Sequence, residues 1–441
     1  MDNTMIASDA TSSQEEFAAW IGLDWADQKH QIALYDVASS KVELHTLKSS
    51  PEGMQEWLAS LRTRYGGAKV ALVLEQSRGS VLYALIGYDF VVLYPVNPQA
   101  LSNYRKVFYP SGAKSDPVDA MLMLDMVRKS PEHFHVWKAD DDVTRSLKLL
   151  VEDRRKLVNQ LTRLTNQLTS RLKTYFPQAL DLAGELDTRQ ACDFLKRWPT
   201  LEDLQSARPA TLRKFYESHG RPRKDTLEQR LQQITKAVPL TKDRAAVLSG
   251  SLMVQALIAQ IRPLVIVIED FDDHIKQLFQ KHPDHLVFES FPGAGEVLAP
   301  RLQAAFGADR ERIQSAAEMQ TLSGVAPVTE QSGKKEYVHW RRGCPKFLRQ
   351  TFQEFAAQSI LRSDWARAYY DQLRNKGKSH NQALRALAYK WIRIMFHCWK
   401  THTPYDEQIY LIALAKRGSG LYAPAIGVGQ MRRLKKLKPA A

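Results

Sequence analysis

The chain has 441 residues, with 62 Lys and Arg against 48 Asp and Glu, so its formal net charge is +14 at neutral pH. A content of 44% hydrophobic and 25% charged residues is typical of a folded globular protein, which excludes a disordered or fibrous chain, and the length predicts about two to four domains. No long uncharged apolar run predicts a membrane span, the 3 scattered cysteines lack metal-ligand spacing, and the surplus of positive charge indicates either good solubility or a polyanionic partner such as nucleic acid.

The first part of the chain predicts a mixed α/β domain over residues 17–138, after a polar and acidic N-terminus at 1–16 that we expect to be disordered. Three strands that can form a meander are followed by helix, strand, helix, strand and helix, so the sheet should have about five strands. The expected strands are 17–25, 30–37, 41–47, 69–74 and 90–96, and the expected helices are 51–64, 80–86 and 116–129.

Four carboxylates in this domain lie where a metal site would need them. Asp24 ends the first strand, Glu75 ends the fourth, and Asp116 and Asp119 lie three residues apart on one face of a helix. Carboxylate oxygens are the ligands that Mg²⁺ or Mn²⁺ prefers. Two such ions can clamp the attacking and leaving oxygens of a phosphodiester. For each residue taken alone, the alternative is that it caps a turn.

Residues 139–285 predict a coiled-coil arm of two long helices, with a polar, helix-rich insert at about 178–250. Pro263 should kink or restart the second helix. The two helices can pair with each other, pair with another subunit, or be ordinary bundle helices. Apolar seam residues recur on alternating three- and four-residue steps at Leu147, Leu150, Leu157, Leu161, Leu164 and Leu168, and again at Leu257, Ile261, Leu264, Ile268, Phe271, Ile275 and Leu278.

The remaining chain predicts a mainly α domain at 286–415 and a basic tail at 416–441, which is expected to be solvated or to touch phosphate. Residues 315–333 predict a helix and a loop. Residues 345–400 predict a basic helical segment whose aromatic side chains we expect mostly in the core.

A helix-hairpin-helix-like element is predicted by FPGAGEVLAPRL at 291–302. Its Gly293 and Gly295 would let backbone N–H groups reach phosphate oxygens at the start of a helix. The alternative is a hairpin that serves packing alone.

The motifs in their order resemble a known family. The chain contains GLDWADQKH, LEQSRG, YPVNPQAL and AKSDPVDA, followed by FPGAGEVLA, LSGVAPVTEQSGKK and RRGCPKFLRQTFQEFAA. Together they resemble the transposases of the IS110 family of bacterial insertion sequences, including its IS1111 branch. The resemblance implies a RuvC-like domain of the ribonuclease H superfamily, with Asp24, Glu75, Asp116 and Asp119 as metal ligands. One departure is that the family usually shows Glu, any residue, Thr and Gly, whereas Glu75 is followed by Gln, Ser, Arg and Gly.

The resemblance also implies a serine nucleophile that bonds transiently to DNA. The matching position is Ser332, because among several Ser-Gly pairs it alone lies between the GVAP loop and the basic segment RRGCPKFLR. Without the resemblance, a turn-capping serine is the simpler interpretation. The expected nucleic-acid contacts, some of which would also stabilise charge on the phosphorus, are Gly293, Gly295, Lys334, Lys335, Arg341, Arg342, Lys346 and Arg349.

Partners follow from the resemblance as well. It implies a dimer or tetramer in which the carboxylate domain of one chain and the serine domain of another form a composite site, acting on DNA in the bacterial cytoplasm. A noncoding guide RNA from the element would specify the DNA by base pairing, and no membrane partner is expected. Two other functions stay open: a metal-only RuvC-like endonuclease or junction resolvase in which Ser332 is structural, and a non-catalytic nucleic-acid-binding protein.

Overall fold

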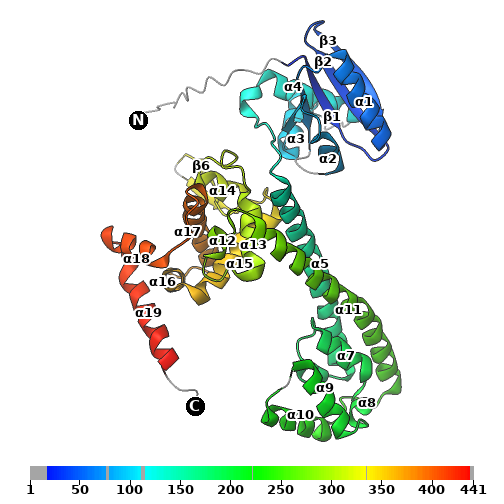
Figure 1. The fold of residues 1–441 in the computed structure, drawn as a ribbon, viewed down its shortest axis with the longest axis vertical. Coiled ribbons are helices and arrows are strands. Elements are labelled where there is room, and N and C mark those ends of the chain that lie inside the picture. The colour runs from blue at the N-terminus through cyan, green and yellow to red at the C-terminus, as the bar shows by residue number, and fades with distance from the viewer. Residues whose placement is uncertain (1–16, 76–78, 111–114, 221, 334, 438–441) are drawn as a thin grey trace. The chain divides into compact units, whose positions relative to one another are not determined.

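The computed structural model describes residues 17–75, 79–110, 115–220, 222–333 and 335–437, with side chains described up to residue 432 (Figure 1). The chain forms two compact units, Met1–Ala139 and Asp140–Ala441, and each is described by itself.

The first unit is built on a five-stranded sheet in the order β3-β2-β1-β4-β5. The antiparallel meander of the first three strands and the parallel pairing of β1 with β4 and β4 with β5 confirm the predicted mixed sheet. Every residue of β4 is buried, because apolar residues from helices pack on both of its faces. The strands are β1 Ala19–Asp24, β2 Lys29–Asp36, β3 Lys41–Lys48, β4 Val70–Leu74 and β5 Val91–Pro95.

The helices of the first unit follow the predicted order with one addition. The sequence predicts no helix directly after β5, but α3 begins there because the Asn97 side chain accepts a hydrogen bond from the Gln99 backbone N–H at 2.8 Å and Pro98 occupies the first turn. The helices are α1 Pro51–Arg64, α2 Ser80–Leu85, α3 Pro98–Phe108, α4 Asp116–Lys129 and the short 3₁₀ helix η1 Pro131–His133.

Gly22 in the middle of β1 lets α4 lie directly on the sheet. A Cβ at this position would overlap the backbone carbonyl oxygen of Ala120 and would lie 2.9 Å from the backbone nitrogen of Leu124. Backbone atoms cannot rotate away as a side chain does, so a larger residue must push the helix from the strand. This close approach sets the distance between α4 and the end of β1.

We expect Gly22→Ala to destabilise the first unit by about 1–3 kcal/mol or more, because the added methyl group overpacks the β1–α4 contact. Thermal melting of the purified variant measures the loss. Gly87→Ala is the matched control, because no atom lies within 4 Å of the position that its Cβ would take. A Gly22→Ala protein that melts like the wild type would contradict the close packing.

Two long helices of the second unit, α5 (Asp142–Tyr175) and α11 (Arg244–Lys281), form an antiparallel pair (Figure 1). The ring of Tyr175 at the end of α5 lies against Gly250 near the start of α11. The expectation of a restart at Pro263 is wrong, since α11 runs on through it for 38 residues. Proline removes a single backbone hydrogen bond, and the apolar face on both sides of it stays packed on α5.

The contact between α5 and α11 contains the apolar residues of the predicted seam, which are buried or half-buried. The insert between the two helices is helical, as predicted, and packs its own apolar residues with this end of the pair. Its helices are α6 Ala179–Leu182, α7 Arg189–Arg197, α8 Leu201–Gln205, α9 Pro209–Gly220 and α10 Lys224–Lys236.

The rest of the second unit is mainly helical around an aromatic core. Trp365, Trp391, Trp399 and Phe355 are fully buried, so the expectation that the aromatic residues of this segment are mostly core is confirmed. The elements are α12 His285–Glu289, α13 Gly295–Phe306, α14 Ala316–Leu322, β6 Val328–Ser332, β7 Lys335–His339, α15 Lys346–Arg362, α16 Asp364–Asn375, α17 His380–Lys400, α18 Glu407–Lys416 and α19 Tyr422–Leu437.

Two details differ from the expected local structure. The predicted loop before residue 333 is instead the first strand of a β-hairpin, since β6 pairs antiparallel with β7. The basic tail is not merely solvated: α19 packs on α16, its Ala425 is fully buried, and Arg432 hydrogen-bonds to the Ile360 carbonyl oxygen at 2.7 Å. Its few small apolar residues are enough to dock it.

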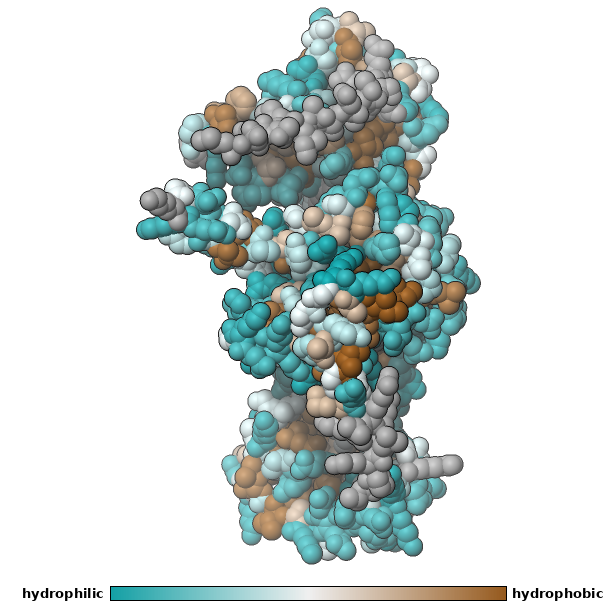
Figure 2. Space-filling model, turned by 90° about the vertical axis from the view of Figure 1, so that its left-hand side faces the viewer, coloured by the Kyte–Doolittle hydropathy of each residue, from teal (hydrophilic) through white to brown (hydrophobic). Residues whose placement is uncertain are grey.

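Among the described helices, α11 alone is long and apolar enough to cross a membrane. A helix that packs in a protein core passes the same test, and α11 packs on α5 and α7. The face drawn in Figure 2 is mainly hydrophilic, with hydrophobic residues in separate patches. The absence of a membrane partner stays a prediction.

Candidate functional site

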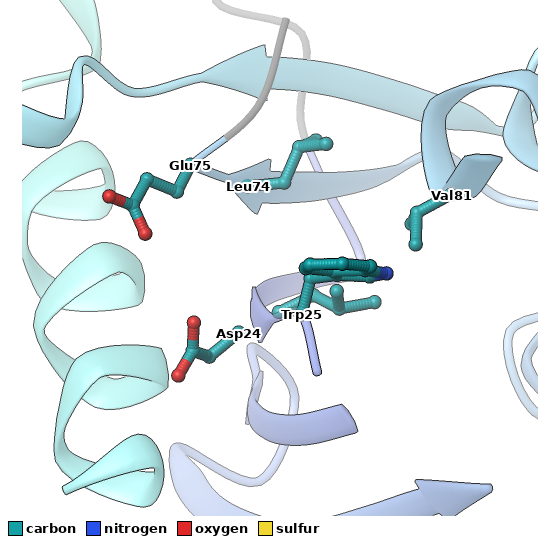
Figure 3. A pocket seen from close by; sticks show the side chains of 6 residues that line it. Asp24, Trp25, Leu74, Glu75 and Val81 are labelled. Carbon is teal, nitrogen blue, oxygen red and sulfur yellow. The ribbon is translucent and has the colours of Figure 1, made fainter. Parts of the chain in front are cut away.

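Asp24 and Glu75 come together at one edge of the sheet in the first unit. Asp24 is the last residue of β1 and Glu75 directly follows β4, and these strands are parallel neighbours in which Leu23 pairs with Leu74. Both carboxylates line a cavity of about 50 Å³, next to Trp25. In Figure 3 they point to the same side, toward a neighbouring helix. The pairing of β1 with β4 thus joins two acids that are far apart in the sequence.

The other two predicted carboxylates lie on α4. Asp119 is only 2% exposed and accepts a hydrogen bond at 2.6 Å from Nε of Arg105 on α3. Asp116 is the first residue of α4 and is exposed. Neither residue lines the cavity of Asp24 and Glu75. The structure therefore unites two of the four acids and places Asp119 on a helix that packs against β1.

The donor chemistry of this edge suits a hard divalent cation. Asp24 and Glu75 offer carboxylate oxygens around one small cavity, and Mg²⁺ takes oxygen ligands of this kind. In the described part of the chain, no three His, Cys, Asp or Glu side chains gather closely enough to hold an ion, and Arg105 engages one oxygen of Asp119. Two acids thus fit the ion, and the full four-carboxylate set stays a prediction.

Two further residues support this edge of the sheet, although no sequence pattern above points to them. Nδ1 of His30 accepts a hydrogen bond from the backbone N–H of Ala26 at 3.3 Å, which fixes the loop after Asp24. Burial lowers the pKa of His30, so the neutral ring keeps this nitrogen able to accept. Arg105 holds Asp119 in place. The signals for them were the string DQKH after the first acid and the capping pair that begins α3.

Ser332 is the last residue of β6 in the second unit. Lys335, the first residue of β7, lies directly opposite, and the turn between them contains Gly333 with a φ of 60°. Opposed residues of an antiparallel pair point to the same face, so Ser332 and Lys335 share one. Both are exposed, and the Ser332 hydroxyl makes no hydrogen bond with a described residue. Lys334 lies outside the described residues.

The other predicted basic contacts follow this hairpin. Arg341 and Arg342 come just after β7, and Lys346 and Arg349 lie on the first turn of α15. None of the four forms an ion pair with a described carboxylate. Nη2 of Arg349 donates to the carbonyl oxygens of Arg341 at 2.5 Å and Arg342 at 3.2 Å, so it ties the hairpin to α15.

The two glycines before α13 have different surroundings. Gly293 has a φ of 85°, and a Cβ there would lie 3.0 Å from the Gln358 carbonyl oxygen, so packing against α15 accounts for it. Gly295 has a φ of 54°, and no atom lies within 4 Å of the position of its Cβ. The predicted phosphate contact is therefore open at Gly295, whereas Gly293 serves the packing alternative.

Two family models match the chain. The model of DEDD transposases of the IS110 type, described as a transposase, matches residues 21–177, and a model described as transposase IS116/IS110/IS902 family matches residues 286–371. The first range contains the four predicted carboxylates and the second contains Ser332.

Similar full-length proteins occur in several bacteria. A protein of the mini-circle element IS117 from Streptomyces coelicolor is 26% identical over 403 residues, which is 90% of this chain and 97% of the relative. An uncharacterized 42 kDa protein of insertion element IS900 from Mycobacterium paratuberculosis is 24% identical over 396 residues, 88% of this chain and 96% of the relative. The uncharacterized 43.6 kDa protein of IS110 from S. coelicolor is 24% identical over 401 residues, 90% of this chain and 97% of the relative.

Proposed function

Because the chain belongs to the IS110 family of insertion-sequence transposases, we propose that it cuts and rejoins DNA with Ser332 as nucleophile and with a carboxylate site for Mg²⁺. The observation that carries the proposal is the meeting of Asp24 and Glu75 at the adjacent ends of β1 and β4, inside the range of the matching family model. The exposed serine with a lysine opposite supports the second half of the chemistry.

In the proposed reaction the Ser332 oxygen attacks a DNA phosphorus, and the bond from that phosphorus to one ester oxygen breaks. Ser332 gives up its proton, and the released strand end gains one as a hydroxyl group. The phosphoserine bond keeps the phosphorus esterified, so a strand hydroxyl can reverse the step and join DNA without an outside energy source. Lys335, on the same face, would offset the extra negative charge on the phosphorus during attack.

The acids of the first unit would hold the metal. Asp24 and Glu75 are the primary ligands in this proposal, with Asp119 and Asp116 from α4 as the others. When bound, Mg²⁺ (or Mn²⁺) would neutralise charge on the phosphate and its leaving oxygen. His30 holds the loop after Asp24, and Arg105 holds Asp119 while no cation competes for it.

The partners of the protein are part of the proposal. A DNA transposase of a bacterial element works in the cytoplasm on DNA, and the family habit adds a guide RNA that pairs with the target and donor strands. Sequencing the RNA that co-purifies with the protein tests this: a single enriched noncoding RNA supports a guide, and unselected cellular RNA contradicts it.

A homo-oligomer with active sites shared between chains gives a distinct expectation for mixed variants. Glu75→Gln lacks a proposed metal ligand and Ser332→Ala lacks the nucleophile, so each alone should be inactive. If chains complement one another, mixing the two proteins restores strand cleavage at the one site that combines the intact halves. Mixtures as inactive as either variant, measured after the chains have been shown to exchange, would rule out sharing between chains.

A further inference from the structure

Trp340, directly after β7, gathers two arginines from different helices. The guanidinium carbon of Arg349 on α15 lies over the Trp340 ring at 4.9 Å from its centroid, and that of Arg385 on α17 lies over it at 3.9 Å. Trp340 is 37% exposed. Cation–π attraction holds each guanidinium to the indole, and so keeps two like charges close together.

Nothing in the described part of the chain balances this charge. Arg385 makes no hydrogen bond or ion pair with a described residue, and Arg349 spends Nη2 on two carbonyl oxygens and the Cys344 sulfur. The only acid near the end of the hairpin that pairs with a base is Glu330, which pairs with His339. Burial lowers the pKa of Arg385, and the charge of Arg349 lowers it further. The free protein thus holds two cations in mutual repulsion.

Several buried donors at this place also lack an acceptor. Nε of Arg349, Nε of Arg385 and Nε of Arg341 are buried without a hydrogen-bond partner, and so is Nε2 of Gln353, one turn further along the same face of α15. Buried N–H groups are nearly always satisfied, so a cluster of donors without acceptors indicates a missing partner that supplies oxygens. A partner with several oxygens and a negative charge answers both the charge and the donors.

We propose that Arg349 and Arg385, held over Trp340, form a binding site for one phosphate of the DNA backbone at the base of the hairpin that carries Ser332. The guanidinium fork matches the oxygens of a phosphodiester better than a lysine does. This proposal rests on the proposed function in one respect only, the choice of DNA as the source of the phosphate. Arg385 and Trp340 would position the strand and would not take part in bond breaking.

The test measures binding apart from chemistry, in full-length protein that carries Ser332→Ala. Affinity for a short fluorescein-labelled DNA duplex is followed by fluorescence anisotropy over a series of KCl concentrations. Adding Arg385→Gln should weaken binding about ten- to a hundredfold and reduce the slope of log affinity against log salt by about one. Trp340→Ala should weaken binding in the same way, whereas Trp340→Phe keeps an aromatic face and should retain most of the affinity.

Arg362→Gln is the matched control, because Arg362 is exposed near the end of the same helix, roughly 20 Å from Arg349. It should leave both affinity and salt slope unchanged. Arg385→Lys keeps the charge and serves if the glutamine variant melts early: it should keep the slope and lose part of the affinity. Wild-type affinity and slope in a well-folded Arg385→Gln protein overturn the site, and so does a loss seen with RNA of the same sequence but not with DNA. Failure of the function itself shows elsewhere, as the lack of a covalent DNA adduct in protein with Ser332 intact.

Discussion

Ser332→Ala should abolish the covalent DNA–protein adduct and lower strand cleavage at least about a thousandfold, because it removes the proposed attacking oxygen while leaving the hairpin backbone unchanged. The measurement uses labelled DNA with wild-type and variant protein, denatured before electrophoresis so that only bonded DNA stays with the protein. Ser332→Cys offers a second nucleophile, and it should restore part of the adduct if its sulfur reaches the phosphorus.

The matched control is Ser249→Ala, which changes another exposed serine that is followed by a glycine. It lies in α11, where alanine suits the helix, and should leave both adduct and cleavage as in the wild type. If Ser332→Ala cleaves DNA at the wild-type rate, water is the attacking group. The metal-only endonuclease then replaces the serine recombinase as the function.

Glu75→Gln should lower cleavage and joining at least about a hundredfold, since it removes one of the two carboxylates around the cavity without changing the size of the side chain. The Mg²⁺ concentration that gives half-maximal activity should rise, because an amide neutralises a dication less well than a carboxylate. A shift in the Mg²⁺ requirement separates a ligand from a residue that acts only on folding, and thermal melting checks the fold.

Asp125→Asn is the control for loss of a negative charge in the same unit. Asp125 lies on α4 but accepts a hydrogen bond from the Tyr104 hydroxyl at 2.8 Å and pairs with Lys129, outside the cavity of Asp24 and Glu75. It should keep the wild-type Mg²⁺ dependence. Unchanged breakage and joining of DNA by Glu75→Gln would instead favour a non-catalytic nucleic-acid-binding protein.

The strand order of the first unit follows from local patterns. Short apolar runs that stop at an acid or a proline define β1, β4 and β5, and the lengths of the connections allow few topologies, so the mixed sheet and the two acids at strand ends could be expected. The helix α3 was missed because Asn97 and Pro98 end a strand as readily as they begin a helix, and only the side-chain cap decides between them.

The candidate sites were predictable to different degrees. The sequence could place Asp24 and Glu75 at the ends of neighbouring strands, but the pairing of Asp119 with Arg105 depends on how α3 meets α4. Ser332 was found through resemblance alone, because a Ser-Gly pair carries almost no signal. Its position at the end of a hairpin follows from the pairing of β6 with β7.

The +14 charge of the chain illustrates the division between the two sources. By itself the sequence determined that basic residues outnumber acids, that the acids of interest follow apolar strands, and which family the motifs resemble, since all of these are properties of neighbouring residues. Only the tertiary structure decided that Arg385 meets Arg349 over Trp340 with no acid to pair them. Such contacts join residues on separate elements, and the packing of the helices α15 and α17 fixes them.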